Sequence, residues 1–321
     1  MEIKGFTYGF NARRGDLLSP EAVDSRARLM ALGINWVCFA FTVRQKTFAS
    51  TEIMFDYART PTDKEITQTI AHFHENGVKV CLKPILNCDD GMWRALIDFP
   101  DSDMMGQDKY WDAWFASYGA FMLHYAEIAA DTGCAMYCTG CEMSGTERKE
   151  GHWRELLAKV RHIYPGLVTY NTNHGNEEKI AWWDAVDYIG TSAYYPVARK
   201  GGASTETMVA AWEKVGRRME AIAAKYDKPL LFAEIGCRSA KGCAAMPWDF
   251  THMHYPRSEE EQARFYDSCL RVFAGQGWFA GAFWWDWSTK IYRDKETAAK
   301  DLGFNIHMKK AEEVVRAWYK N

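Results

Sequence analysis

Two glutamates stand at the ends of apolar segments, where a charged side chain calls for an explanation. Glu142 follows the run 134–141, and Glu234 interrupts the run 230–236. A carboxylate in such a setting must be hydrogen-bonded, paired or protonated, because burying it ionised and alone costs on the order of several kcal/mol. Either glutamate by itself could be a structural ion pair or an exposed strand end. Two of them at strand ends favour a catalytic role.

Paired carboxylates can cleave the bond between two sugars. One carboxylic acid protonates the leaving oxygen while the other carboxylate attacks the anomeric carbon, and about 5 Å separates the two in a retaining mechanism. The acid needs a raised pKa to hold its proton near neutrality, whereas the nucleophile must stay ionised through hydrogen bonds or nearby cations. Arg44, which follows the second predicted strand, is a candidate for such a cation.

The elements that position these side chains follow a repeating order. Apolar, β-branched or aromatic strands alternate with amphipathic helices along the whole chain. The predicted strands are 3–8, 35–41, 78–86, 134–140, 167–171, 188–194, 230–235 and 279–285. The predicted helices are 20–32, 62–77, 109–132, 151–164, 205–226, 258–274 and 308–319, with a segment around 182–183 in the remaining connection. Because parallel strands need crossover connections, eight units predict an α/β fold, a single (β/α)8 TIM barrel domain over residues 1–321.

An open, doubly wound sheet is the alternative architecture. Such a sheet usually carries a G-x-G-x-x-G fingerprint for a dinucleotide after its first strand. The segment Gly5-Phe6-Thr7-Tyr8-Gly9 lacks this spacing, so the barrel is favoured. In a barrel, residues at the carboxyl ends of the strands face the active-site mouth, and Glu142 and Glu234 then end the fourth and seventh strands.

Several short motifs resemble the clan A glycoside hydrolases, and family 113, the β-mannanases, in particular. They are Lys83-Pro84, Gly140-Cys141-Glu142, Tyr194-Tyr195-Pro196, Phe232-Ala233-Glu234-Ile235-Gly236 and Phe283-Trp284-Trp285-Asp286-Trp287. The resemblance implies that Glu142 is the acid/base and Glu234 the nucleophile of a retaining hydrolysis of β-1,4-linked mannose units, without a metal or organic cofactor. One departure is Cys141, because many clan A families place there an asparagine that binds the sugar 2-hydroxyl.

Further residues are candidates for binding the sugar, since aromatic rings stack on its C–H faces and polar groups bind its hydroxyls. Trp284 and Trp285 end the eighth predicted strand, whose alternation turns only one of them inward; the resemblance favours Trp285. Tyr194 ends the sixth strand, where clan A enzymes often place a tyrosine that donates a hydrogen bond to the nucleophile. The remaining candidates follow the second, third and fifth strands: Arg44, Lys83, Asn87, Asn171 and His174.

The cysteine spacing raises a different possibility. Cys134, Cys138 and Cys141 have the C-x3-C-x2-C spacing with which radical S-adenosylmethionine enzymes hold an iron–sulfur cluster. Alternation along the fourth strand separates Cys141 from the other two, which disfavours a shared cluster. Another clan A β-glycosidase, of the glucan or xylan type, and a non-catalytic sugar-binding barrel are further alternatives.

A zinc hydrolase is also weighed. His72 and His74 are two residues apart in a predicted helix and point in divergent directions, while His252 and His254 lie in a long loop. Solvated histidines are the simpler interpretation of both pairs.

Composition limits the partners and the compartment. Lys and Arg total 39 against 42 Asp and Glu, so a net charge of -3 gives no basic field to attract nucleic acid or an anionic membrane. The N-terminal segment carries charges where a secretion signal would be apolar, and nine cysteines, an odd number, suit reduced thiols. We expect a cytoplasmic enzyme acting on an oligosaccharide or polysaccharide, or a secreted one if a leader has been removed.

Overall fold

The computed structural model describes residues 1–56, 58–102, 104–252 and 254–320, and the pairing of its strands other than β3 (Ile53–Met54) is that of a closed parallel barrel. The strands are β1 (Ile3–Tyr8), β2 (Trp36–Gln45), β3 (Ile53–Met54), β4 (Lys79–Cys88), β5 (Met136–Cys141), β6 (Leu167–Asn173), β7 (Tyr188–Ser192), β8 (Leu230–Ile235) and β9 (Phe279–Trp287). Their hydrogen-bonded order is β1-β9-β8-β7-β6-β5-β4-β2, and β1 also pairs with β2, which closes the ring. The short strand β3 pairs antiparallel with β2.

Amphipathic helices connect the strands, and their starts are encoded locally. They are α1 (Pro20–Met30), α2 (Asp63–Glu75), α3 (Lys109–Asp131), α4 (Glu150–Ile163), α5 (Thr205–Tyr226), α6 (Glu259–Phe273), α7 (Lys295–Lys300) and α8 (Lys310–Lys320). The Ser19 side chain accepts a hydrogen bond from the Ala22 N–H at the start of α1, and Thr62 and Glu65 form a capping box on α2. In the part of the chain that is described, no helix is both long and apolar enough to cross a membrane.

The predicted (β/α)8 barrel is confirmed, with differences in the connections. The bounds predicted for α5 and β8 agree with the structure residue for residue. The connection between β6 and β7 holds two short 3-10 turns, η2 (Glu177–Lys179) and η3 (Trp183–Ala185), instead of an α-helix. The strand β3 and the helix α7 were not predicted, because each is too short for a periodic pattern to show.

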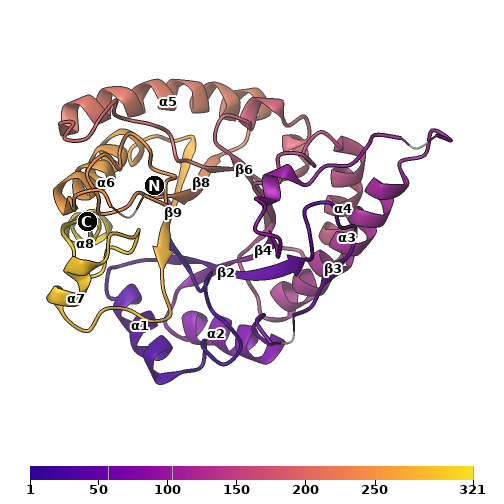
Figure 1. Cartoon of the computed structure of the whole chain (residues 1–321), viewed down its shortest axis with the longest axis horizontal. Helices are drawn as coiled ribbons and strands as arrows, with labels where there is room; N and C mark the ends of the chain where they lie inside the picture. The colour runs from indigo at the N-terminus through magenta and orange to yellow at the C-terminus, as the bar shows by residue number, and fades with distance from the viewer. Residues whose placement is uncertain (57, 103, 253, 321) are drawn as a thin grey trace. The chain divides into compact units, whose positions relative to one another are not determined.

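The chain divides into two compact units. The first comprises residues 1–9, 19–38 and 192–321, and the second comprises residues 10–18 and 39–191. In the first unit, α5 packs against α6 and α6 against α8 (Figure 1). In the second unit, α3 packs against α4. The assignment of residues 1–321 to one catalytic domain remains a prediction.

An aromatic cluster in the second unit supports the loop that follows β5. The ring of Trp153, on α4, stacks on Trp182 with 5.0 Å between centroids and meets the edge of Tyr170, on β6, at 4.9 Å. The Trp153 indole N–H donates to the Thr146 carbonyl at 3.0 Å, and that of Trp182 donates to the Glu147 carbonyl at 3.1 Å. These bonds tie the loop that follows β5 to the helix layer.

The first unit depends on a close approach between β1 and β9. Ile3 is the partner of Gly281 in this parallel pair. Gly281 has a φ of 146°, and a Cβ atom placed on it would lie 2.0 Å from the Ile3 carbonyl oxygen. Only glycine fits there, because a side chain would force the two backbones apart.

Replacing Gly281 by alanine is therefore expected to lower the free energy of unfolding by about 3 kcal/mol, through overpacking and backbone strain. Urea denaturation measures the loss. Gly277→Ala is the matched control, since nothing lies within 4 Å of its added Cβ. It should stay within about 0.5 kcal/mol of the original chain. Equal stability of the two variants would contradict the close approach.

Candidate active site

Glu142 directly follows β5 and has an unusual backbone. Its φ is 53°, in the left-handed region, and only 7% of the residue is exposed. A residue with a side chain adopts this conformation at a cost of about 1–2 kcal/mol, so the surroundings must hold it. Its N–H donates to the Asn171 carbonyl on β6 at 2.7 Å. The turn aims the carboxylate away from the regular course of the strand.

Arg94 compensates the charge of Glu142. It opens the 3-10 turn η1 (Arg94–Leu96) after β4, and its Nη2 lies 2.8 Å from Glu142 Oε2. The two side chains are 11% and 10% exposed. The guanidinium is itself held, because Nε donates to the Cys141 carbonyl at 2.9 Å and Nη1 to Asn87 Oδ1 at 3.0 Å. The geometry favours the ionised form of Glu142 while the pair is intact.

Cys141, the departure from the clan A pattern, is enclosed by polar groups. Its Sγ lies 3.2 Å from Asn171 Nδ2 and 3.5 Å from Arg94 Nη2. Asn87 and Asn171, both predicted to bind sugar hydroxyls, therefore belong to the polar cluster around Glu142. Lys83 is fully buried on β4, and His174 is half-buried in the turn after β6.

Glu234 lies on β8 and is 3% exposed. The Tyr194 hydroxyl donates to its Oε2 at 3.3 Å, and the backbone carbonyl of Glu234 accepts from the Ala193 N–H at 2.6 Å. Tyr194 is itself 7% exposed, so this bond sits largely out of water. A hydrogen bond to a carboxylate favours its charged form, which a nucleophile requires.

Asp286 adds a third carboxylate, next to Trp285 at the end of β9. Burial raises its pKa to about 6, and the negative charges of Asp301 and Glu234 add to the effect. Lys309 acts in the opposite direction, and its Nζ lies 3.1 Å from Asp301 Oδ2. Asp286 and Glu234 are therefore two acidic groups that interact near the ends of the adjacent strands β9 and β8.

The two tryptophans at the end of β9 differ in their surroundings. Trp284 is fully buried, stacks on Tyr266 of α6 with 4.0 Å between centroids, and donates from its indole nitrogen to the Tyr319 hydroxyl on α8 at 2.9 Å. This packing among helices is evidence against a sugar contact for Trp284. Trp285 is partly exposed, in agreement with the alternation of the strand.

Arg44 belongs to a separate ion cluster. It is paired with Asp89, which also accepts a hydrogen bond from Arg59 at 2.9 Å. Although burial acts to raise it, these bonds leave the pKa of Asp89 below its ordinary value. The cation predicted to support the nucleophile is therefore committed to Asp89.

Sequence reasoning missed Arg94 and Asp286. Arg94 lies in an irregular loop, and its partner Glu142 is 48 residues further along the chain, so no local pattern connects them. Asp286 lies inside a motif already noted, and its position one residue before the end of β9 was a usable signal.

The metal alternatives find little support in the geometry. Cys138 Sγ donates to the Gly140 carbonyl at 3.3 Å, whereas Cys141 Sγ contacts Arg94 and Asn171. The thiols therefore serve different contacts. In residues 1–56, 58–102, 104–252 and 254–320, no three His, Cys, Asp or Glu side chains gather in a group that could hold a metal ion.

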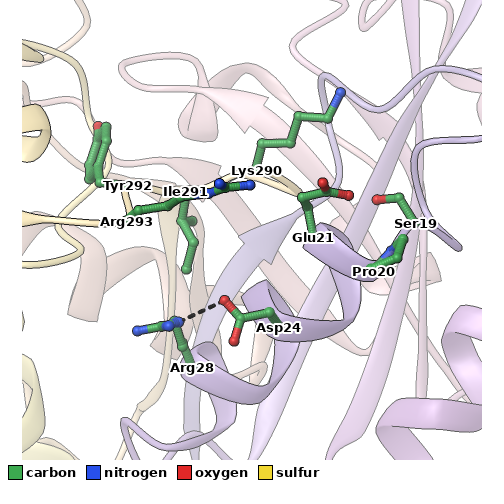
Figure 2. Close-up of a pocket in the computed structure, with 9 residues that line it drawn as sticks. All are labelled: Ser19, Pro20, Glu21, Asp24, Arg28, Lys290, Ile291, Tyr292 and Arg293. Carbon is green, nitrogen blue, oxygen red and sulfur yellow. Dashed lines mark hydrogen bonds and ion pairs between the residues drawn. The ribbon is translucent and has the colours of Figure 1, made fainter.

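A pocket of about 780 Å³ lies in the first unit, beside the start of α1 (Figure 2). Its wall includes the ion pair between Arg28 and Asp24, 2.9 Å apart, and the segment 290–293. None of the predicted catalytic or sugar-binding residues lines it, so it is separate from the candidate site.

The family profile and two similar solved structures agree on one family. The profile of Glycoside Hydrolase Family 113 matches residues 6–309. A GH113 β-1,4-mannanase solved as a complex is 37% identical, with a TM-score of 0.91 and 100% of both chains covered. The GH113 β-mannanase AaManA from Alicyclobacillus acidocaldarius, in complex with ManMIm, is 39% identical, with a TM-score of 0.90, covering 99% of this chain and 97% of that one.

More distant structures share the fold alone. A β-glucuronidase from Ruminococcus gnavus is 14% identical, with a TM-score of 0.65, and the match covers 99% of this chain and 50% of that one. The search of curated proteins found no match.

The raised pKa of Asp286 predicts a pH-dependent difference in stability. Between pH 4 and pH 6 the unfolded chain ionises this carboxyl while the folded protein keeps it protonated, so folding stability falls as the pH rises through that window. Relative to Asp286→Asn, the original chain should lose on the order of 2–3 kcal/mol between pH 4 and pH 7. Urea denaturation at several pH values measures this. A difference that does not change with pH contradicts the raised pKa.

Proposed function

The chain belongs to glycoside hydrolase family 113, and from that premise we propose that it hydrolyses β-1,4-mannosidic bonds in mannan or manno-oligosaccharides by double displacement. The observation that carries the proposal is the family match over residues 6–309. The solved structures of GH113 β-mannanases, 37–39% identical over nearly the whole chain, support the same substrate class.

The proposed reaction has two steps at one anomeric carbon. In the first, Glu234 attacks this carbon, the bond to the leaving oxygen breaks, and protonated Glu142 gives its proton to that oxygen. In the second, Glu142, now a carboxylate, takes a proton from water, and the water oxygen displaces Glu234. Each displacement inverts the centre, so the product keeps the β configuration.

The partners of the two glutamates bear on these roles in different ways. The hydrogen bond from Tyr194 stabilises negative charge on Glu234, as a nucleophile needs before attack. The ion pair with Arg94 stabilises the carboxylate of Glu142, the form that accepts a proton from water in the second step. The first step needs the other form, so Glu142 must take up a proton before each cycle.

We propose Trp285 as the sugar platform and polar residues near Glu142 as the groups that bind hydroxyls. Trp285 is partly exposed, in contrast to the buried Trp284, and an aromatic ring at a protein surface can stack on the C–H face of a sugar. Asn87 and Asn171, which adjoin Glu142, are the favoured hydroxyl-binding candidates among those predicted. Lys83, His174 and Arg44 stay as predictions.

A cytoplasmic location is part of the proposal, with short imported oligosaccharides as substrates. All nine cysteines are buried free thiols, which suits a reducing compartment. Cell fractionation with an antibody against the protein tests this, and recovery of the protein from the medium would contradict it.

The substrate class is tested by product analysis on mannan, manno-oligosaccharides, cellulose and xylan, with Glu234→Gln as the inactive control. We expect release of manno-oligosaccharides only, and none from the control. Release of sugars from cellulose or xylan at a comparable rate would favour a glucan- or xylan-type enzyme instead.

The roles of the two glutamates predict different kinetic losses. Glu142→Ala should lower kcat/KM, which reports the first step, by about 10²–10⁴-fold for phenyl β-mannobioside but by under about tenfold for the 2,4-dinitrophenyl analogue, because a good leaving group needs little acid assistance. Glu234→Ala should be inactive on both and should not be labelled by a 2-fluoro mannosyl inhibitor, as mass spectrometry would report. Equal losses on both substrates in Glu142→Ala contradict the acid role.

Stacking on Trp285 predicts a loss of affinity. In the Glu234→Gln background, Trp285→Ala should weaken binding of mannotetraose by about 1–3 kcal/mol, while Trp285→Phe, which keeps a ring, should lose less. Calorimetric titration measures both. Unchanged affinity in the alanine variant would remove Trp285 from the site.

A further inference from the structure

The left-handed backbone of Glu142 raises the question of what holds it. The Glu142 N–H is fixed by Asn171, and the next peptide is fixed by a side chain: the Met143 N–H donates to the Tyr170 hydroxyl at 3.2 Å. Tyr170 lies on β6 and is fully buried. The peptide links on both sides of the Glu142 α-carbon are therefore anchored to the same neighbouring strand.

The orientation of the Tyr170 hydroxyl is set by a second carboxylate. The Tyr170 hydroxyl donates to Glu147 Oε1 at 2.9 Å. A hydroxyl has one proton, so committing it to Glu147 leaves its lone pairs for the Met143 N–H. Chains of this kind strengthen one another in a buried setting. Glu147 is thus linked to the backbone beside Glu142 through one residue, Tyr170.

The side chain of Glu147 is itself held by several hydrogen bonds. It is 6% exposed, and its Oε1 also accepts from the Thr172 hydroxyl at 2.7 Å. Its Oε2 lies 3.5 Å from Asn176 Nδ2, and its backbone carbonyl accepts from the Trp182 indole. A buried carboxylate is costly to keep, and a hydrophobic residue could fill the volume, so its retention calls for a role.

We propose that Glu147 and Tyr170 are positioning residues that hold Glu142 in its left-handed conformation, so that its carboxyl group is presented to the leaving oxygen. The inference rests on the proposed function, since it takes Glu142 as the general acid. Neither residue touches the substrate in this account. They act through the backbone of Met143 and the loop that leads from Glu142 to Glu147.

The protonation of Glu147 decides which substitution preserves the link. Burial raises its pKa to about 7, against the hydrogen bonds from Thr172 and Tyr170, while the charge of Glu177 adds to the rise and that of Lys179 opposes it. Both protonation states can accept at Oε1, as can a glutamine amide oxygen. Glu147→Gln should therefore keep the link, and Glu147→Ala should break it.

The experiment compares phenyl and 2,4-dinitrophenyl β-mannobioside, which differ only in the leaving group. Tyr170→Phe and Glu147→Ala should lower kcat/KM for the phenyl substrate by about 10–100-fold and for the dinitrophenyl substrate by under about threefold, as partial loss of acid assistance requires. Glu147→Gln should keep the ratio of the two rates within about threefold. Circular dichroism establishes that each variant is folded.

Tyr137→Phe is the matched control. Tyr137 lies on β5, is fully buried, and its hydroxyl donates to the Met122 carbonyl on α3 at 2.7 Å, and not to the loop after Glu142. It loses a comparable buried hydrogen bond, and its rate ratio should match that of the original chain. A general loss of stability would lower kcat/KM for both substrates by similar factors in all the variants.

The Glu142→Ala background distinguishes a failure of this positioning inference from a failure of the proposed acid role of Glu142. There, adding Tyr170→Phe should change neither rate further, because the group that Tyr170 positions is gone. A rate ratio unchanged by Tyr170→Phe and by Glu147→Ala, with Glu142→Ala still selective for the phenyl substrate, overturns this inference alone. No leaving-group dependence in Glu142→Ala overturns the acid role and this inference with it.

Discussion

A carboxylate buried at the end of a barrel strand needs a partner for its charge, and this constraint shapes both proposed catalytic residues. Glu142 has a full cation, Arg94, whose guanidinium is fixed by Asn87 and by the Cys141 carbonyl. Glu234 has a neutral donor, Tyr194. A cation stabilises charge more strongly than a phenol, whereas the proposed reaction requires Glu142 to shed and regain a proton in each cycle. In that proposed reaction, substrate binding or protonation of Glu142 has to weaken the ion pair with Arg94.

The periodic elements could be predicted from the sequence because their signals are local. The helix α5 and the strand β8 were found to the residue, since a serine cap opens the first and an apolar run defines the second. The two glutamates were found because they break apolar runs. Arg94, Tyr170 and Glu147 were not, because their roles depend on partners that only the fold brings together. The left-handed φ of Glu142 carries no sequence signal, since such turns normally announce themselves with glycine.

The barrel alone does not decide the chemistry. The β-glucuronidases share the fold at 13–14% identity, so the architecture is common to enzymes with different names and activities. Beside the proposed acid, Cys141 stands where clan A enzymes often have asparagine, and Asn171 and Arg94 lie close to its sulfur. Asp286, with its pKa raised to about 6, adds a carboxylate close enough to Glu234 for their charges to interact.

The central claim is that two carboxylates act in turn on one anomeric carbon. The most direct test is the proton NMR spectrum of the sugar released in the first minutes of mannotetraose hydrolysis, before the free anomers interconvert. Double displacement predicts that the β anomer forms first and the α anomer appears later by mutarotation. Initial release of the α anomer would mean a single displacement by water, and would contradict the nucleophilic role of Glu234.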